Sequence, residues 1–548
     1  MRLRLLVLGF SLAWPLAARA ACPDDDYVTT ICLYGETGTC RQSCDLSGAK
    51  VQATIDASAE GDGVYLPSGS ATWDSQVDFD KAVTYMGAGR ENTLITVGSG
   101  TCSTLSTTNA CVYVTADNAD IGFIGWRIGN SGPQAILTAG VTGLKIHDCD
   151  FRRTVAYTSG HTHHVQHLGD ARGVIFSNTF YGGGVGFDGS NDPPWAAATG
   201  WGGPDFLYIE GNVFSDANAY TTVPLSSGMR TLYGNAGAKV VFRYNSVLAE
   251  DSRIGHDNPI DAHGYCHGPH VRSTRAYEIY NNLMQSSPGT MTSRFFFLRG
   301  GTGLVYNNML DKSQGAPSGS DIELRDYRSA DDLSVGTNGY GDACSPGTGV
   351  ENAIRALCLP TYYGVRVSWS PLTSQVDKLL GGETSGTEAA VWALRAGTPT
   401  AIEFMSYGGT GFLSGENLLV DGVAAGTATQ DQETFNGEGY PCADQIGRGQ
   451  NNTAEPYFFW GNVDQDLAAV VAVASAGQIA GYITEGVDFC NHDTSTSCGG
   501  ITVTPAAARC PLEATGLSGT CDAGLHGVSG YNVEGGRAPA APANLRAS

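Results

Sequence analysis

The stretch Phe206-Leu-Tyr-Ile-Glu-Gly-Asn-Val-Phe214 combines a short apolar strand, a polar turn that contains an asparagine, and a further apolar residue. A similar order returns at five other places in the chain, at 143–151, 173–180, 240–247, 276–283 and 303–309. When these segments are aligned, one column holds the turn asparagines Asn178, Asn212, Asn245, Asn282 and Asn308. Repeats separated by a few tens of residues are typical of a solenoid whose coils carry loop insertions.

Two columns of the alignment predict how such coils stack. Parallel strands in neighbouring coils lie about 4.8 Å apart, so each turn asparagine can hydrogen-bond the equivalent side chain in the next coil. A second column places six apolar residues at one inward position: Ile146, Ile175, Ile209, Phe242, Ile279 and Val305. A continuous apolar stack buries a core that no single coil can build. We therefore predict an all-β parallel β-helix with long loop insertions. The alternative is a β-sandwich with asparagine-rich turns, which does not require strands in recurring register.

Two segments upstream of the repeats, 51–67 and 83–96, resemble the opening coils of pectate-lyase-like proteins. The resemblance extends from about Val51 to Leu324 and implies a right-handed parallel β-helix. It also implies a short capping helix at the open end, at about Val51 to Ala59. The superfamily includes polysaccharide lyases, glycoside hydrolases, epimerases, adhesins and phage tailspikes, so the fold does not select one activity.

The chain divides into five expected regions. Residues 1–20 have a basic start, an apolar run and small residues before the expected cut, which is the pattern of a cleaved signal peptide. Residues 21–50 form a disulfide-rich segment, 51–330 the β-helix, and 331–537 late coils and long loops packed on the helix. Residues 538–548 resemble a linker that leads into a fibronectin type III module. We expect a secreted or cell-surface protein.

Composition narrows the range of partners. Fifteen cysteines favour an oxidising compartment with disulfide bonds. The 31 Lys and Arg residues against 54 Asp and Glu residues give a net charge of −23, which argues against nucleic acid as a partner. No apolar stretch after the signal peptide reaches the length of a membrane span. We expect a polysaccharide partner, while the sequence leaves the oligomeric state open.

The strand face before each turn commonly forms the substrate groove of a β-helix. Counting back equally from the inward column brings Leu168, Asn235, Arg272 and Leu298 to one position. Arg299 lies one residue beyond this position, and a bulge at Gly300-Gly301 would restore the match. Arg272 and Arg299 would then be neighbours on adjacent coils and suited to a sugar carboxylate. The alternative is that both arginines pair with surface carboxylates.

These positions give a hypothesis of a polysaccharide lyase that cleaves a uronic-acid polymer by β-elimination. Such chemistry needs a cation at the carboxylate, a base for the adjacent proton and a donor for the leaving oxygen. We assign the base to His263 or His270, the clamps to Arg272 and Arg299, and the donor to Tyr233 or Tyr265. The expected substrate-binding residues are Arg275, Arg294, His163, His167, Trp195 and Trp201, although the two tryptophans could equally pack their insertion onto the scaffold.

Two further functions remain open. A glycoside hydrolase needs two carboxylates across the scissile bond, and the candidates Asp188, Asp192, Glu210, Asp257 and Asp261 form no recognisable pair. A non-catalytic glycan-binding or adhesin β-helix is the other alternative.

Metal ions are a separate expectation. Calcium is a possible cofactor, with Asp257, Asp261, Asp188 and Asp192 as candidate ligands, although turn capping explains such carboxylates equally well. The spacing of His263, Cys266, His267 and His270 suggests zinc or copper less strongly, because Gly264, Gly268 and Pro269 disfavour a helix there.

Overall fold

The structure is a computed structural model of the whole chain, and the description covers part of it. Residues 1–25 and 503–548 lie outside the described residues. So do the internal stretches 35, 99–109, 129–133, 155–162, 191–193, 196, 216–230, 249–258, 265–272, 287–293, 314, 318, 325–360, 372–377, 392, 396–399, 405–407, 437–445, 450–452, 475–482, 492–496 and 499–500. The expected signal peptide and linker-like tail therefore fall outside it. Among the described helices, none has the length and apolar character to cross a membrane.

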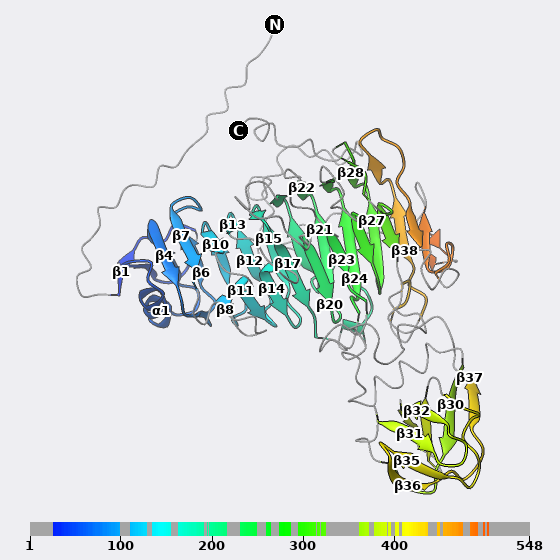
Figure 1. Cartoon of the computed structure of the whole chain (residues 1–548). Helices are drawn as coiled ribbons and strands as arrows, with labels where there is room; N and C mark the ends of the chain where they lie inside the picture. The colour runs from blue at the N-terminus through cyan, green and yellow to red at the C-terminus, as the bar shows by residue number, and fades with distance from the viewer. Residues whose placement is uncertain are drawn as a thin grey trace.

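Three long sheets run side by side along the chain (Figure 1). Sheet 1 contains β1 Tyr27–Thr30, β2 Cys40–Ser43, β3 Gly63–Leu66, β6 Thr84–Gly87, β9 Asp120–Gly122, β12 Leu144–His147, β15 Gly173–Phe176, β18 Leu207–Glu210, β21 Lys239–Arg243, β24 Ala276–Tyr280, β27 Thr302–Tyr306, β38 Tyr457–Trp460 and β41 Phe489–Asn491. Sheet 2 contains β4 Gly69–Trp73, β7 Thr93–Val97, β10 Gly125–Ile128, β13 Asp150–Arg153, β16 Thr179–Tyr181, β19 Val213–Ser215, β22 Ser246–Leu248, β25 Leu283–Gln285, β28 Met309–Asp311 and β39 Val463–Asp464. Sheet 3 contains β5 Val77–Phe79, β8 Ala110–Val114, β11 Gln134–Ala139, β14 His163–Leu168, β17 Gly184–Asp188, β20 Leu232–Asn235, β23 Ile260–Ala262, β26 Phe296–Leu298, β29 Ile322–Leu324 and β40 Ala472–Ala474.

From β3 onward the chain visits sheets 1, 2 and 3 in turn, and each strand pairs in parallel with its equivalent one coil away. The predicted inward column is confirmed, since Ile146 pairs with Ile175, which pairs with Ile209, and the register continues through Phe242 and Ile279 to Val305. All six side chains are fully buried. The protein is a parallel β-helix.

The predicted asparagine ladder is confirmed at the turns from sheet 1 to sheet 2. The Nδ2 atom of Asn212 donates to Oδ1 of Asn245 at 3.1 Å and to the Ile175 carbonyl at 2.9 Å. The same pattern joins Asn178 to Asn212 and runs on to Asn308, whose Nδ2 donates to Asn462. The residue before each of these asparagines has a left-handed backbone, with φ near 55° at Ser177 and Tyr244. Each turn therefore closes in the same two-residue geometry.

The amino-terminal end of the solenoid is capped by α1, Gly48–Asp56. Val51 and Ile55 are fully buried and belong to the main core with Trp73 and Val77 of the first coil. The helix begins three residues before the predicted Val51 and ends three before the predicted Ala59. The amphipathic pattern of this segment therefore places a helix on the exposed end of the apolar stack.

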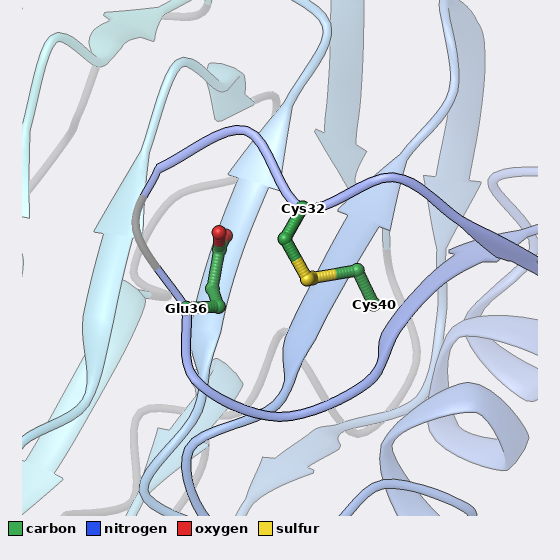
Figure 2. A group of neighbouring side chains, drawn as sticks. All are labelled: Cys32, Glu36 and Cys40. Atoms are coloured by element: carbon green, nitrogen blue, oxygen red, sulfur yellow. A yellow bond between two sulfur atoms is a disulfide. The ribbon is translucent and has the colours of Figure 1, made fainter.

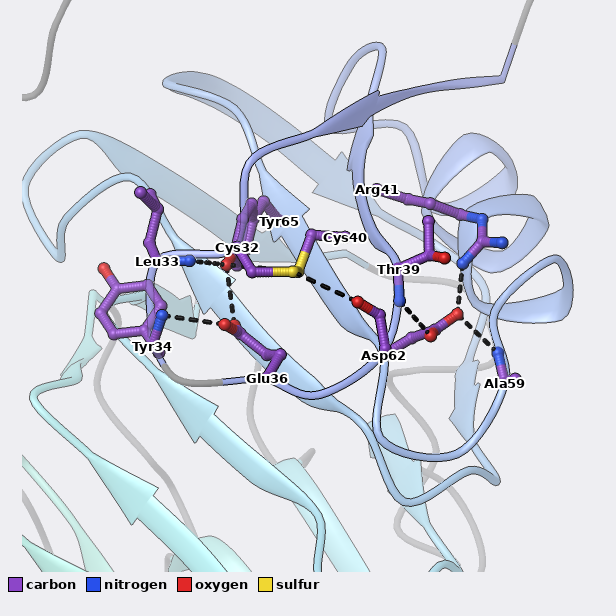
Figure 3. Close-up of a disulfide and its surroundings, with 11 residues drawn as sticks. Cys32, Leu33, Tyr34, Glu36, Thr39, Cys40, Arg41, Ala59, Asp62 and Tyr65 are labelled. Carbon is purple, nitrogen blue, oxygen red and sulfur yellow. Dashed lines mark hydrogen bonds and ion pairs between the residues drawn. A yellow bond between two sulfur atoms is a disulfide. The ribbon is translucent and has the colours of Figure 1, made fainter.

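At this end sheet 1 continues into an antiparallel hairpin of β1 and β2, in which β2 pairs in parallel with β3 and a disulfide joins Cys32 to Cys40 across the connecting loop (Figure 3). Asp62 accepts hydrogen bonds from the backbone N–H groups of Thr39 and Ala59 at 2.6 and 2.9 Å. It also pairs with Arg41. A second described disulfide joins Cys490 and Cys498 near the other end. Cys149, by contrast, is a buried free thiol.

Residues 361–436 differ from the prediction of late coils and loops. They form two four-stranded antiparallel sheets, one of β30 Thr361–Arg366, β33 Ala393–Arg395, β34 Ala401–Phe404 and β37 Glu433–Asn436, the other of β31 Leu379–Gly382, β32 Glu388–Ala390, β35 Asn417–Val420 and β36 Val423–Thr427. These sheets share their own buried cluster, which includes Val365, Leu380, Ile402 and Phe404. The unit is inserted between β29 and β38. The late coils expected there are present only after it, at β38 to β41.

Candidate active site on sheet 3

The candidate site lies on the outer face of sheet 3. Along each strand, alternate side chains point into the core, for example Leu232 in β20 and Ile260 in β23, which are fully buried in the main core. The intervening side chains form two outer columns across the coils. The first column holds Gln166, Gly186, Tyr233, Asp261, Phe297 and Glu323. The second holds Leu168, Asp188 and Asn235, followed by His263 and Arg299 directly after β23 and β26.

This register corrects the predicted one. Leu298 belongs to the core, and Arg299 continues the column of Asn235, as the backbone N–H of Arg299 donating to the Ala262 carbonyl at 2.9 Å shows. The residue beside Arg299 on the adjacent coil is His263, whose N–H donates to the Gly234 carbonyl at 2.8 Å. The predicted pairing of Arg299 with Arg272 cannot be assessed, because Arg272 lies outside the described residues.

Arg299 and Asp261 form a buried ion pair in this face. The guanidinium donates to Oδ1 of Asp261 at 3.0 and 2.7 Å and to Oδ2 at 2.7 Å. The ring nitrogen Nε2 of His263 lies 3.9 Å from Oδ2 of the same carboxylate. Arg299 is 2 % exposed, His263 3 % and Asp261 fully buried. A bidentate pair of this kind fixes the plane of the guanidinium, and Asp261 places one negative charge beside Arg299 and the imidazole of His263.

Tyr233 packs against two histidines. Its ring centroid lies 4.9 Å from that of His263, at an interplanar angle of 60°, and 5.3 Å from that of His163. Its hydroxyl accepts a hydrogen bond from Nδ2 of Asn235 at 3.2 Å. His163 and Tyr233 come from strands two coils apart and meet because Gly186, on the strand between them, has no side chain. A Cβ atom at Gly186 would collide with His163 and Gln166.

The face changes in character along the helix axis. Toward the amino-terminal coils, Gln166 donates to Asp188 at 2.8 Å, and both His163 and Asp188 are partly exposed. Toward the carboxy-terminal coils, the guanidinium groups of Arg294 and Arg299 lie 4.2 and 4.6 Å from the ring centroid of Phe297. Arg294 also pairs with Glu323. The predicted residues His163, Tyr233, His263, Arg294 and Arg299 therefore all lie on this one face.

His167, which the sequence suggested as a substrate-binding residue, does not lie on this outer face. It points into the core, where its Nδ1 lies 2.6 Å from the Thr138 hydroxyl oxygen, and it is fully buried. Burial lowers the pKa of His167 to about 3. His163 and His167 face opposite sides of β14 because a bulge between His163 and Val165 interrupts the regular alternation of the strand.

Arg275 and Trp195, also suggested as substrate-binding residues, are buried away from this outer face. Arg275 is fully buried and donates to both carboxylate oxygens of Glu455, at 2.8 and 3.1 Å. Its guanidinium lies 5.1 Å from the Trp195 ring centroid, and the indole N–H donates to the Ser273 carbonyl at 3.0 Å. Trp201 packs against the apolar cluster on the outer face of sheet 1. The insertion that carries both tryptophans thus packs onto the scaffold.

Several predicted residues lie outside the described residues and stay predictions. They are Asp192, Asp257, Tyr265, Cys266, His267, His270 and Arg272. Residues that the sequence did not single out are Gln166, Gly186 and Phe297, and Asn235 was noted only for its register. Every second residue of a strand faces the same side. Counting two residues forward from Tyr233 and from Asp261 would therefore have placed Asn235 beside His263.

The expected calcium site stays a prediction. Of its four expected ligands, Asp261 pairs with Arg299 and Asp188 accepts from Gln166, while Asp192 and Asp257 lie outside the described residues. Within the described residues, one group places three possible ligand atoms close together: Cys32, Glu36 and Cys40 (Figure 2). Its two sulfur atoms are bonded to each other, so they are not thiolates, the form of cysteine that binds metal. Glu36 instead accepts from the Tyr65 hydroxyl at 2.8 Å and from the Tyr34 N–H at 2.8 Å (Figure 3).

Comparison with known proteins does not identify a family for this chain. No protein-family model matches the chain, and no curated protein sequence matches it. Among solved structures, an alginate lyase from Paenibacillus sp. str. FPU-7 matches over 51 % of this chain and 91 % of that one. The two are 12 % identical, with a TM-score of 0.22. A likeness at this level carries no functional argument, so the function is argued from the site.

Proposed function

We propose that the protein is a polysaccharide lyase that cleaves a uronic-acid polymer by β-elimination on the outer face of sheet 3. The observation that carries this proposal is the contact of Tyr233 with His263, beside Arg299 and Asn235. These four residues supply a base, a proton donor and two donors for a carboxylate. Such a set is the minimum that elimination next to a uronate carboxylate requires.

In the proposed reaction, His263 removes the proton from C5 of the uronate. The electron pair forms the C4–C5 double bond while the C4–O bond breaks, and Tyr233 donates a proton to the departing oxygen. Donors on Arg299 and Asn235 stabilise the charge that develops on the carboxylate. Asp261 acts as a positioning residue, because it holds the guanidinium of Arg299 through both carboxylate oxygens. The low exposure of the cluster strengthens each of these interactions.

The carboxylates of this face argue against a glycoside hydrolase. A hydrolase of this type needs one carboxyl group that is protonated and ready to donate. Asp261 is paired with Arg299, and Glu323 is paired with Arg294, so each of these carboxylates is already engaged by a guanidinium. Of the other candidates, Glu210 pairs with Arg243 on the outer face of sheet 1 and Asp188 accepts from Gln166, while Asp192 and Asp257 lie outside the described residues.

The test is ultraviolet absorbance of the unsaturated uronate during incubation with alginate, de-esterified pectin, glucuronan and glycosaminoglycans. Calcium is added in one series and a chelator in another, which also tests the expected cofactor. We expect a rise on at least one polymer that falls at least about a hundredfold in Tyr233→Phe and in His263→Gln, the scale of general acid–base catalysis. Tyr306→Phe on the outer face of sheet 1 is the matched control and should keep full activity.

Two outcomes would contradict the proposal. New reducing ends without a rise in absorbance would indicate hydrolysis, and binding of a polymer without either product would indicate a glycan-binding protein. A rise that survives both substitutions would place a lyase site elsewhere on the molecule.

A further inference from the structure

The carboxy-terminal end of the β-helix is unfinished within the described residues. Sheets 2 and 3 end at β39 and β40, whereas sheet 1 continues for one more strand, β41. The described chain then leaves the helical path into a short antiparallel pair, β42 Ser497–Cys498 and β43 Ile501–Thr502. The last coil therefore has its first strand but not the strands that would cover β39 and β40.

Apolar side chains are exposed at this end. Leu467, Val471, Val473 and Val487 are 66, 53, 44 and 48 % exposed. Two of them, Leu467 and Val471, line a cavity of about 190 Å³ together with Phe459, Val463 and Val470. Of the ten large apolar residues that are exposed in the described chain, four lie between 467 and 487. We call these four residues and the cavity the end surface.

The amino-terminal end shows how this protein treats such a surface. There α1 buries Val51 and Ile55 against the first coil, and the hairpin of β1 and β2 extends sheet 1 over the edge. A solenoid needs a cap at each end, because its terminal coils would otherwise expose the apolar stack to water. The exposed apolar side chains of the end surface are those expected of a surface that another segment covers.

We infer that the end surface is the docking site of the chain's own segment 503–537, which acts as the carboxy-terminal cap. The described chain reaches this end of the helix at Thr502, and the disulfide between Cys490 and Cys498 ties β42 to β41 there. The following sequence supplies apolar residues at short intervals: Leu512, Leu517, Leu525, Val528, Tyr531 and Val533. The segment can therefore reach the surface without a long connection and has side chains to fill the cavity.

Charge favours this occupant over a second copy of the protein. Asp464, Asp466 and Glu485 lie within three residues of Leu467 or Val487 in the sequence. Two copies that met through this face would bring the same carboxylates together, which is unfavourable in a chain with a net charge of −23. The segment 503–537 carries only Arg509, Glu513, Asp522, Glu534 and Arg537, so its net charge is close to zero.

The test is photo-crosslinking in the full chain, with a benzophenone amino acid in place of Val471. We expect a crosslink within one molecule to a peptide from 503–537. The control places the same group at Val423, which is 69 % exposed in the antiparallel unit and should give no such peptide. A crosslink to a second molecule, or none to the segment, would overturn the inference.

A second measurement avoids the need for a crosslinker. A variant that lacks 503–548 should keep its β-sheet circular dichroism and bind several-fold more of an apolar fluorescent dye than the full chain. Substituting Leu467→Asp and Val471→Asp in this shortened chain should reverse the gain in dye binding. If removing the segment leaves dye binding unchanged, the end surface is not its docking site.

Discussion

The guanidinium of Arg299 reaches across one coil and donates to both carboxylate oxygens of Asp261, the shortest contacts being 2.7 Å. The two residues are far apart in the sequence, and neither side chain is more than 2 % exposed. The pair therefore couples the stability of two adjacent coils to the geometry of the candidate site. Removing one partner leaves a buried charge uncompensated, which is more costly than removing both.

The first prediction follows from this pair. Asp261→Asn should lower the free energy of unfolding by about 3–5 kcal/mol, because the buried guanidinium of Arg299 then loses the negative charge to which it donates. Urea unfolding at neutral pH measures the change. The matched control is Asp421→Asn, which removes the exposed partner of Lys378 and should change stability little. Equal effects of the two substitutions would show that the Arg299 pair is not buried as the structure has it.

The second prediction concerns the asparagine ladder. Asn245 is fully buried, accepts from Asn212, and donates to the Ile209 carbonyl and to Asn282. Asn245→Ala should destabilise the protein by about 3 kcal/mol or more, since each buried polar group left unsatisfied costs about 1–3 kcal/mol. Asn417→Ala, at an exposed asparagine that bonds Glu383, is the control for thermal unfolding. A loss no larger than in this control would contradict a role of the ladder in stability.

The ladder and the inward column could be predicted from sequence because each is set within one short segment. Ile209 and Asn212 lie three residues apart on the same strand and turn, so their spacing survives any insertion elsewhere in the coil. Stacking then follows from parallel pairing alone. The fold class depends only on such local units.

The groove could not be placed as well, because the connections from sheet 3 to sheet 1 differ in length. Residues 236–238 separate Asn235 from Lys239, whereas only 300–301 separate Arg299 from Thr302. Counting back an equal number of residues from the inward column of sheet 1 therefore placed Arg299 one residue away from its true position, which assigns it to the opposite face of the strand. Long-range pairs could not be predicted for another reason. Arg275 contacts Glu455, which lies 180 positions further along the chain, and no local sequence pattern indicates that contact.

The third prediction concerns Gly186, whose lack of a side chain lets the rings of His163 and Tyr233 meet. Gly186→Ala should separate the rings of His163 and Tyr233, because the new methyl group occupies the space of His163 and of the Gln166 amide. Both neighbours are side chains that can move, so the thermal midpoint should change little while lyase activity falls about tenfold or more. Gly381→Ala is the control, since a Cβ there meets no atom. Unchanged activity would remove the His163–Tyr233 contact from the candidate site.

The fourth prediction concerns acid stability. Burial lowers the pKa of His167 to about 3, against about 6.5 for an unfolded histidine. Between these values the unfolded chain binds a proton that the folded chain does not, so this residue's contribution is complete above pH 6.5 and is lost as the pH falls toward 3. His167→Gln can keep a contact with Thr138 and removes the titration. Its stability should fall less between pH 6.5 and pH 4.5 than that of the unmodified protein, as measured by urea unfolding at each pH.

The control for this measurement is a histidine whose shift has the opposite sign. Burial opposes protonation of His147, but hydrogen bonds to Asp120 and Asp148 at 2.9 Å outweigh it and raise its pKa to about 9. Its contribution is present below pH 6.5 and is lost as the pH rises through 9. His147→Gln should therefore flatten the alkaline side of the stability profile and leave the acid slope unchanged. If His167→Gln also leaves the acid slope unchanged, the imidazole of His167 is not held neutral in the core.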